Sequence, residues 1–292
     1  MNKFISGLAG LPRRLKGIPK VPLGILLLFV FSGIFAPFLA LHNPEIGNPE
    51  HRLTPPIWQN GGRATYPLGT DTLGRDIYSR LVFGARISLV IAFIAVIISS
   101  TLGACIGAIS GFFGGKVDLV IMRIVDTWIS IPPIMFGILM AIIAGPGMWN
   151  IAIIISIIMW TRYARVVRGE TLSLKSRDFV HLATVAGVSK FRIIARHILP
   201  NVMPVVITMA TVQIGVAIGA EAALSFLGVG VPPPKPAWGL MLAECKGGLF
   251  TGHWWPVVLP GFCIMMFVMS INFIGDYLRR RIDPHFRHLW EK

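Results

Sequence analysis

The chain has 292 residues, of which 54% are hydrophobic and only 14% are charged, and its mean hydropathy is +0.71. Soluble domains carry about 25% charged residues, so this composition excludes an ordinary soluble protein and indicates an integral membrane protein. The net charge of +14 would fit nucleic-acid binding only if the basic residues shared one soluble face, and they do not. The three cysteines lack metal-ligand spacing, so we expect neither a zinc site nor a disulfide framework.

Long runs without Asp, Glu, Lys or Arg predict the membrane-spanning helices, because about 20 apolar residues cross the hydrocarbon core. The runs are 21–41, 87–115, 127–161, 198–220 and 254–275. The third run is too long for one helix and is divided by Gly145-Pro146-Gly147, so we expect six transmembrane helices. The fourth helix must extend to about Arg168, with Arg162, Arg165 and Arg168 directed toward lipid phosphates.

The first run follows five basic residues, as the apolar part of a signal peptide does. Residues 21–41 are longer than the 7 to 15 residues that are usual for a cleaved segment, and no clear A-x-A site follows. We therefore expect a retained first helix.

The distribution of basic residues predicts the orientation, since an even number of helices places both termini on one side. Nineteen Lys and Arg fall on that side and six on the other, which predicts cytoplasmic termini. The expected order is a cytoplasmic segment 1–20, the first helix 21–41, an extracytoplasmic loop 42–86, a five-helix core 87–275 and a cytoplasmic tail 276–292. The core includes a cytoplasmic loop 169–197 and an extracytoplasmic loop 230–253.

Small residues at four-residue spacing predict close helix packing. Gly103, Gly107 and Gly111 show this spacing in the second helix, and Gly215 and Gly219 show it in the fifth. Pro132-Pro133 predicts a bend in the third helix, and Pro256 and Pro260 predict one in the sixth.

Three polar features fall inside or near the predicted spans. One is a small, mildly polar stripe that either lines a pathway or packs against a neighbour, formed by Thr208, Thr211, Gly215 and Gly219. Glu221 falls near the outer boundary of the fifth helix and is a candidate outer gate. Arg123 and Asp126 are expected to pair on one face of the third helix.

The loop between the fourth and fifth helices predicts a helix, a tight turn and a second helix. Ser176 or Asp178 can cap the first helix, Gly187 can end it in a left-handed conformation, and Ser189 can cap the second. Because the unit is tethered between two spans, docking onto a cytoplasmic protein is a better interpretation than DNA binding.

This loop is similar to the E-A-A-x-x-x-G loop of binding-protein-dependent ABC permeases, in which L-P follows the glycine. Ala183 and Gly187 match, as do Leu199 and Pro200, whereas His181 and Leu182 replace the first Glu and Ala. Further matches resemble the peptide and nickel branch, especially the "C" subunit of dipeptide and oligopeptide importers; they lie at 68–76, 79–80, 84–89, 223–232, 236–239, 275–276 and 283–284.

The resemblance implies a type I ABC importer permease fold in the bacterial inner membrane. It implies import of dipeptides or oligopeptides by alternating access, as a heterodimer with a second permease, two ATPase subunits and an extracytoplasmic binding protein. The loop that contacts the ATPase would include the residues Asp178, His181, Leu182, Ala183, Ala186 and Gly187. Nickel or another small solute remains an alternative cargo. A secondary transporter remains an alternative class of protein.

No nucleotide site is expected in this chain. The nearest string to a phosphate-binding loop, Ser110 to Val117, lacks the first Gly and the final Ser or Thr of G-x-x-x-x-G-K-[ST]. ATP and Mg²⁺ are therefore expected on the partner ATPases, and this chain is expected to be neither an enzyme nor a binder of a cofactor or metal. A secondary transporter would show inverted repeats and midplane charges, and no clear repeat is present.

Overall fold

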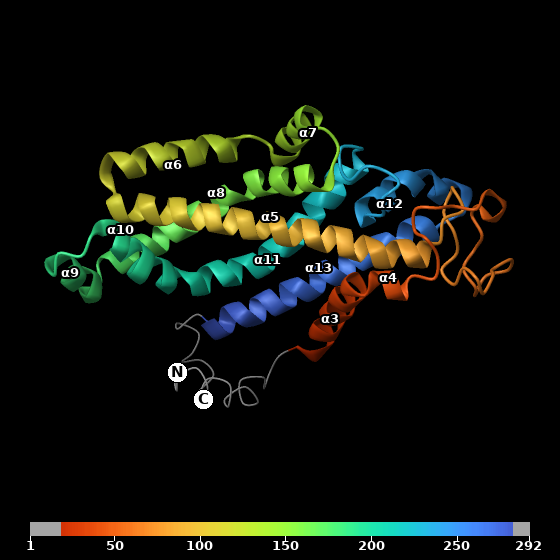
Figure 1. The fold of residues 1–292 in the computed structure, drawn as a ribbon, viewed down its shortest axis with the longest axis horizontal. Coiled ribbons are helices and arrows are strands. Elements are labelled where there is room, and N and C mark those ends of the chain that lie inside the picture. The colour runs from red at the N-terminus through yellow and green to blue at the C-terminus, as the bar shows by residue number, and fades with distance from the viewer. Residues whose placement is uncertain (1–18, 283–292) are drawn as a thin grey trace.

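Four long helices lie roughly along one axis, with α11 antiparallel to the other three, and form the body of the protein (Figure 1). They are α5 (Ile77–Phe113), α8 (Met148–Lys175), α11 (Leu199–Phe226) and α13 (Trp255–Ile282). The computed structural model describes residues 19–282, so most of the predicted terminal segments 1–20 and 276–292 lies outside the described residues. The remaining helices are α3 (Lys20–Ile34), α4 (Ala36–Leu39), η1 (Pro49–His51), α6 (Gly115–Ser130), α7 (Pro133–Ala144), α9 (Asp178–Val185), α10 (Lys190–Ile193), η2 (Ile194–Ile198), α12 (Trp238–Cys245) and η3 (Lys246–Thr251).

The length and composition of the helices support the second to sixth predicted spans. The four long helices, with α10 and η2 continuing into α11, are each long and apolar enough to cross a membrane. The pair α6 and α7 passes the same test together but is bent by 90° where Pro132 and Pro133 interrupt the chain, which confirms the predicted bend. The predicted break at Gly145-Pro146-Gly147 is also present, because α7 ends at Ala144 and α8 begins at Met148.

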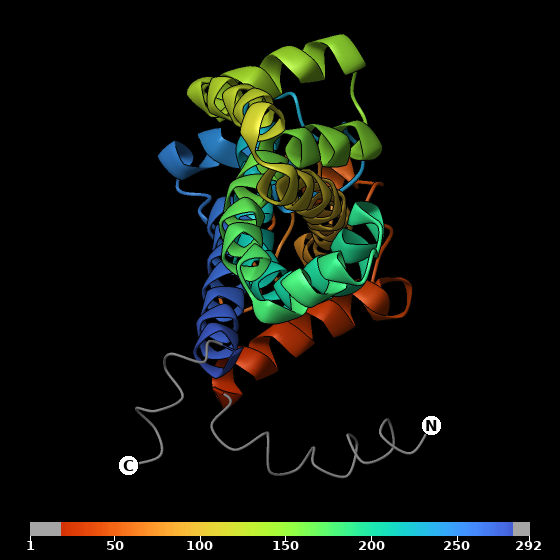
Figure 2. The same ribbon diagram turned by 90° about the vertical axis from the view of Figure 1, so that its left-hand side faces the viewer.

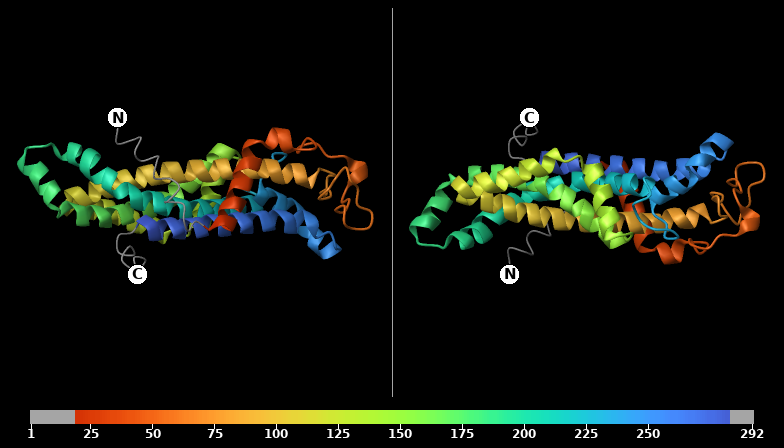
Figure 3. Two further views of the ribbon diagram at one scale, coloured as in Figure 1. Left: turned by 90° about the horizontal axis from the view of Figure 1, so that it is seen from below. Right: turned by 90° about the horizontal axis from the view of Figure 1, so that it is seen from above.

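The predicted first helix, 21–41, is shorter than expected. The helix α3 has 15 residues and ends before Phe35, and the short α4 follows it. Figure 3 shows α3 crossing α5 and α13 obliquely instead of running alongside them. It lies on the opposite side of the bundle from α6 and α7 (Figure 2). Within the described chain, four or five helices therefore qualify as spans, and the sixth is not confirmed.

The helix α5 begins ten residues before the predicted second span, at Ile77. Asp76 is its N-cap, and the carboxylate accepts a hydrogen bond from Ser79 N at 3.0 Å. The prediction required a run free of charged residues and so stopped short of Arg80 and Arg86. Arg80 can lie within this helix because its buried charge is paired with carboxylates.

The contact between α5 and α8 depends on the predicted glycine stripe. A Cβ on Gly103 would lie 2.4 Å from Trp160 O, and one on Gly107 would lie 2.4 Å from Ala164 O. A Cβ on Gly111 would similarly lie 2.8 Å from Arg168 O. The two backbones therefore approach closely along the whole stripe.

Two charge predictions are corrected by contacts between α6 and α8. Asp126 pairs with Arg165 of α8, not with Arg123 on its own helix. Arg168 binds Asp118 of α6 through two hydrogen bonds. Arg165 and Arg168 are therefore held by carboxylates and not directed toward lipid phosphates, because carboxylate partners lie within reach on the neighbouring helix.

The long helices define two ends of the molecule (Figure 1). One end, which we call the loop end, carries residues 40–76 together with α12 and η3. The opposite end carries α9 and α10, and we call it the α9 end. One cluster of buried apolar side chains joins α5, α8, α11, α12 and α13, and a smaller one lies near the α9 end.

Candidate functional site

The segment α9–turn–α10 has the predicted helix–turn–helix form. Gly187 has φ +73° and follows the last turn of α9, as expected for a left-handed C-terminal residue. Its N–H donates to Thr184 O at 3.1 Å, and Val188 N–H donates to Ala183 O at 3.1 Å. This pair of hydrogen bonds is the Schellman motif, which reverses the chain sharply after α9.

The predicted side-chain caps of this segment are wrong in detail. Arg177 is the N-cap of α9 and makes no side-chain cap hydrogen bond. The Ser176 hydroxyl donates instead to Ser173 O at 2.9 Å, because α8 extends to Lys175 and places Ser176 at its own C-terminus. Ser189 is the N-cap of α10, but its hydroxyl makes no cap hydrogen bond.

The outer face of α9 is apolar and has no covering segment among the described residues. Leu182 is 68% exposed and Val185 is 87% exposed, and Phe191 of α10 is 71% exposed. Asp178, His181, Ala186 and Gly187 are also exposed, whereas Ala183 is half-buried. Large apolar side chains gathered on an exposed face are typical of a docking surface for another protein.

The inner face of α9 and α10 is anchored to the long helices. Val180 and Ile193 are 3% and 1% exposed, and they belong to the apolar cluster that contains Phe112 of α5 and Val167 of α8. The π-helical turn η2 then joins α10 directly to α11. The segment α9–turn–α10 therefore packs against α5 and α8 and continues into α11.

Glu221, the candidate gate residue, is fully buried inside the bundle. Its carboxylate accepts hydrogen bonds from the Ser88 hydroxyl of α5 at 3.0 Å and from the Ser225 hydroxyl at 2.7 Å. Ser225 Oγ also accepts a hydrogen bond from Val231 N at 3.3 Å. Glu221 thus links α5, α11 and the segment that follows α11.

The polar stripe of α11 faces another helix. The Thr208 hydroxyl donates to Pro204 O at 2.9 Å, and the Thr211 hydroxyl donates to Thr208 O at 2.7 Å. A Cβ on Gly215 would lie 3.2 Å from the Ile271 side chain of α13. Nothing described lies within 4 Å of the corresponding position on Gly219. Gly215 therefore packs against α13, and the two threonine hydroxyls are hydrogen-bonded within α11.

A buried ion cluster at the loop end was not predicted from the sequence. Arg75 Nε lies 2.6 Å from Asp71 Oδ2, and Arg75 Nη2 lies 2.6 Å from Glu244 Oε2. Arg80 Nη2 lies 2.7 Å from the same Glu244 oxygen, and Arg80 Nη1 lies 3.3 Å from Asp71 Oδ2. Burial opposes the charged form of Arg75, but the carboxylates of Asp71 and Glu244 outweigh it and raise its pKa.

Part of this cluster lies in the string 68–76, which was identified from the sequence only as a resemblance to the peptide and nickel branch. Its two acidic residues serve different purposes, since Asp71 pairs with both arginines and Asp76 caps α5. The sequence could not predict Glu244 as a partner of Arg75, because Glu244 lies 169 residues later in the chain.

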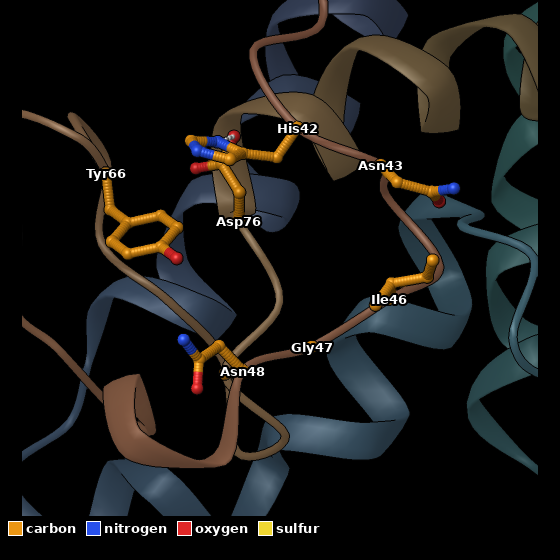
Figure 4. Close-up of a pocket in the computed structure, with 8 residues that line it drawn as sticks. His42, Asn43, Ile46, Gly47, Asn48, Tyr66 and Asp76 are labelled. Atoms are coloured by element: carbon orange, nitrogen blue, oxygen red, sulfur yellow. Dashed lines mark ion pairs between the residues drawn. The ribbon is translucent and has the colours of Figure 1, made fainter.

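A pocket of about 230 Å³ lies beside this cluster (Figure 4). The His42 ring lies against the Tyr66 ring with centroids 4.9 Å apart, and His42 Nδ1 is 3.5 Å from Asp76 Oδ2. The other lining residues are Asn43, Ile46, Gly47, Asn48 and Gly74. Across residues 19–282, no group of three or more His, Cys, Asp or Glu could hold a metal ion.

Comparison with known proteins places these features in a family. Residues 103–288 match the family described as binding-protein-dependent transport system inner membrane component. The di/tripeptide transport system permease protein DppC of Pseudomonas aeruginosa (strain UCBPP-PA14) is 40% identical over 263 residues, which cover 90% of this chain and 86% of that protein. The dipeptide transport system permease protein DppC of Haemophilus influenzae (strain ATCC 51907 / DSM 11121 / KW20 / Rd) is 38% identical, covering 89% and 88%.

A solved structure supports the fold. A chain from the structure titled "Inward facing conformations of the MetNI methionine ABC transporter: CY5 SeMet soak crystal form" has a TM-score of 0.58 and 19% identity, and the match covers 70% of this chain and 96% of that one. At this identity the likeness concerns the fold alone. The family match and the DppC relatives together show that this chain belongs to the binding-protein-dependent transport system inner membrane components, the permease subunits of ABC transporters.

Proposed function

We propose that this chain is one of two permease subunits of an ATP-driven importer that moves dipeptides or oligopeptides across the inner membrane by alternating access. The observation that carries the choice of solute is the relatives' similarity over nearly their whole length: four proteins described as DppC are 35% to 40% identical over 89% to 94% of this chain. Nickel remains the alternative solute.

The orientation that we propose places the α9 end in the cytoplasm. The described part of this end exposes basic side chains that include Arg177, Lys190, Arg192 and Arg196, with Arg279 and Arg280 at the end of α13. Positive charge concentrates on the cytoplasmic side of membrane proteins, so this distribution supports cytoplasmic termini. We further propose that α3 provides the sixth span in the assembled transporter.

The proposed partners occupy the two ends. The exposed residues Leu182 and Val185 of α9 would enter a groove on one ATPase subunit, which binds ATP and Mg²⁺. The extracytoplasmic binding protein would deliver the solute to residues 42–80 and 230–253 at the loop end. A second, homologous permease would complete the pathway as a heterodimer.

Transport by the complete assembly tests this function. Proteoliposomes that contain this chain, its partner permease and both ATPases, supplied with the binding protein, should accumulate a labelled dipeptide only when ATP is present. Vesicles prepared without this chain provide the control. Accumulation of Ni²⁺ but not of the dipeptide would show that nickel, and not peptide, is the solute. ATP-independent uptake driven by an ion gradient would overturn the proposal.

A further inference from the structure

The helix α12 is held between four other helices near the loop end. Its Trp238 is fully buried and donates a hydrogen bond from Nε1 to Leu81 O of α5 at 3.0 Å. The indole ring lies 5.3 Å from the Phe29 ring of α3 and 6.4 Å from the Phe267 ring of α13, measured between centroids. On the fourth side, a Cβ on Gly239 would lie 2.5 Å from Ala222 Cα of α11.

The other end of α12 is fixed by charge. Glu244 is the one acidic residue between Trp238 and Cys245, and its side chain is 18% exposed. Both Arg75 and Arg80 donate to Glu244 Oε2, at 2.6 Å and 2.7 Å. These arginines come from the N-terminal end of α5 and the residues just before it, so Glu244 joins α12 to the start of α5.

The charges of this cluster balance only when Glu244 is ionised. Two guanidinium groups face the two carboxylates of Asp71 and Glu244, and the side chains of Asp71, Arg75 and Arg80 are at most 3% exposed. Arg80 Nε already has no hydrogen-bond partner among the described residues. Loss of Glu244 would leave one buried positive charge without a partner, whereas joint loss of Glu244 and Arg80 would keep the pair of Asp71 and Arg75.

We propose that Glu244 is a positioning residue of the transporter. Held by Arg75 and Arg80, it keeps α12 and Trp238 seated between α3, α5, α11 and α13, and so maintains the packing of the extracytoplasmic end that transport requires. This role rests on the proposed transport function, which places the loop end on the extracytoplasmic side of the membrane.

A native cysteine next to Glu244 reports the position of α12. Cys245 is 3% exposed, and burial together with the nearby Asp71 and Glu244 carboxylates raises the pKa of its thiol to about 11. Both effects keep the thiol unreactive near neutral pH while α12 is seated, because the thiolate is the reactive form. Replacement of Cys105 and Cys263 by Ala leaves Cys245 as the single thiol.

The experiment compares three changes in this single-cysteine chain, within the complete transporter, using a membrane-impermeant maleimide added from outside. Because the Glu244 charge itself raises the Cys245 pKa, each rate is expressed per thiolate, with the thiol pKa of each variant measured from the pH dependence of labelling. On this scale Glu244→Gln should be labelled at least about tenfold faster than the parent, because an unbalanced buried charge favours local opening. The charge-balanced double variant Arg80→Met with Glu244→Gln should return to within about twofold of the parent rate. Glu50→Gln, which removes an exposed carboxylate at the same end, should leave Cys245 as slowly labelled as in the parent.

Uptake of a labelled dipeptide should follow the same order, falling in Glu244→Gln and recovering in the double variant. Unchanged labelling of Glu244→Gln would overturn the proposal, and so would a double variant that remains fast. If Glu244→Gln fails to assemble, the double variant decides: an assembled complex with a slowly labelled Cys245 is expected, and failure of this variant to assemble also counts against the role. Absence of peptide uptake by the parent would instead reject the proposed function, since the labelling does not depend on the solute.

Discussion

Arg168 of α8 holds Asp118 of α6 through two hydrogen bonds, with Nε 2.5 Å from Oδ1 and Nη2 2.6 Å from Oδ2. The Ser110 hydroxyl of α5 donates to the same carboxylate at 2.5 Å. Asp118 therefore connects three helices at the α9 end, although most of α6 is exposed in the described chain.

Asp118→Asn should weaken this connection. The pair is partly exposed, so we expect a loss of about 1–2 kcal/mol in unfolding free energy, an amount typical of a bidentate pair that water screens in part. Arg168→Met should cost a similar amount, and the double variant should cost less than the sum of the two. Thermal unfolding of the four proteins in detergent measures this coupling, and strictly additive losses would show that the two side chains act independently.

The glycine stripe of α5 makes a second prediction about stability. Gly107→Ala places a Cβ 2.4 Å from Ala164 O, so α5 and α8 must separate, and the expected loss is about 1–3 kcal/mol. Gly169→Ala is the matched control, because Gly169 lies in the interior of α8 with nothing described within 4 Å of its Cβ position. That substitution should be neutral or stabilising, since Ala favours a helix over Gly.

Chemical denaturation of both variants in mild detergent provides the comparison. Equal stability of Gly107→Ala and the parent would show that α5 and α8 tolerate a wider separation than the structure indicates.

Local sequence patterns were sufficient to predict the elements whose cause is local. Uncharged runs located the four helices that are long and apolar enough to cross a membrane and the bent pair α6–α7, Pro132-Pro133 located the bend, and Gly187 located the turn after α9. The same rule missed the start of α5, because it treats every charge as a boundary and Arg80 is buried in an ion cluster.

Features that depend on distant partners could not be predicted in this way. Helical spacing favoured a pair between Asp126 and Arg123, but Arg165 lies 39 residues later and reaches Asp126 only once α6 packs beside α8. The hydrogen bond that Ser88 donates to Glu221 has the same origin, since 133 residues separate the two. The glycine spacing marks close packing but does not name the neighbour.

The exposed face of α9 makes a prediction about assembly. Val185→Glu adds a charge to a side chain that is 87% exposed and contacts little within the chain, so insertion into the membrane should be unaffected. In the proposed docking groove, however, an unpaired carboxylate would be desolvated, and binding of the ATPase should fall by at least about tenfold. Copurification of the ATPase subunits with the tagged permease measures the effect.

Ser173→Glu is the control for Val185→Glu. It adds the same charge at the same end of the molecule, on an exposed position of α8 and not of α9. Equal loss of the ATPase in both variants would indicate a general effect of negative charge at this end, and the docking role of Val185 would be withdrawn.

Gly187 makes the sharpest prediction, because its requirement is purely conformational. Its φ is +73°, and nothing described lies within 4 Å of the position that a Cβ would take. A side chain therefore meets no steric obstacle, and only the backbone conformation opposes substitution. Gly187→Val should cost about 1–3 kcal/mol in the turn, since a β-branched residue is poorly tolerated at positive φ.

The turn should then rearrange without unfolding the spans. Insertion should survive because Gly187 is exposed and outside the long helices, whereas α9 would no longer present Leu182 to the ATPase in the proposed geometry. Peptide uptake and peptide-stimulated ATP hydrolysis should both fall in proteoliposomes. Gly187→Asn is the discriminating control, because Asn adopts the left-handed conformation more readily than other residues with a side chain. It should retain most of the uptake, and if Asn and Val were equally damaging, the loss would have to come from the presence of a side chain and not from the backbone conformation.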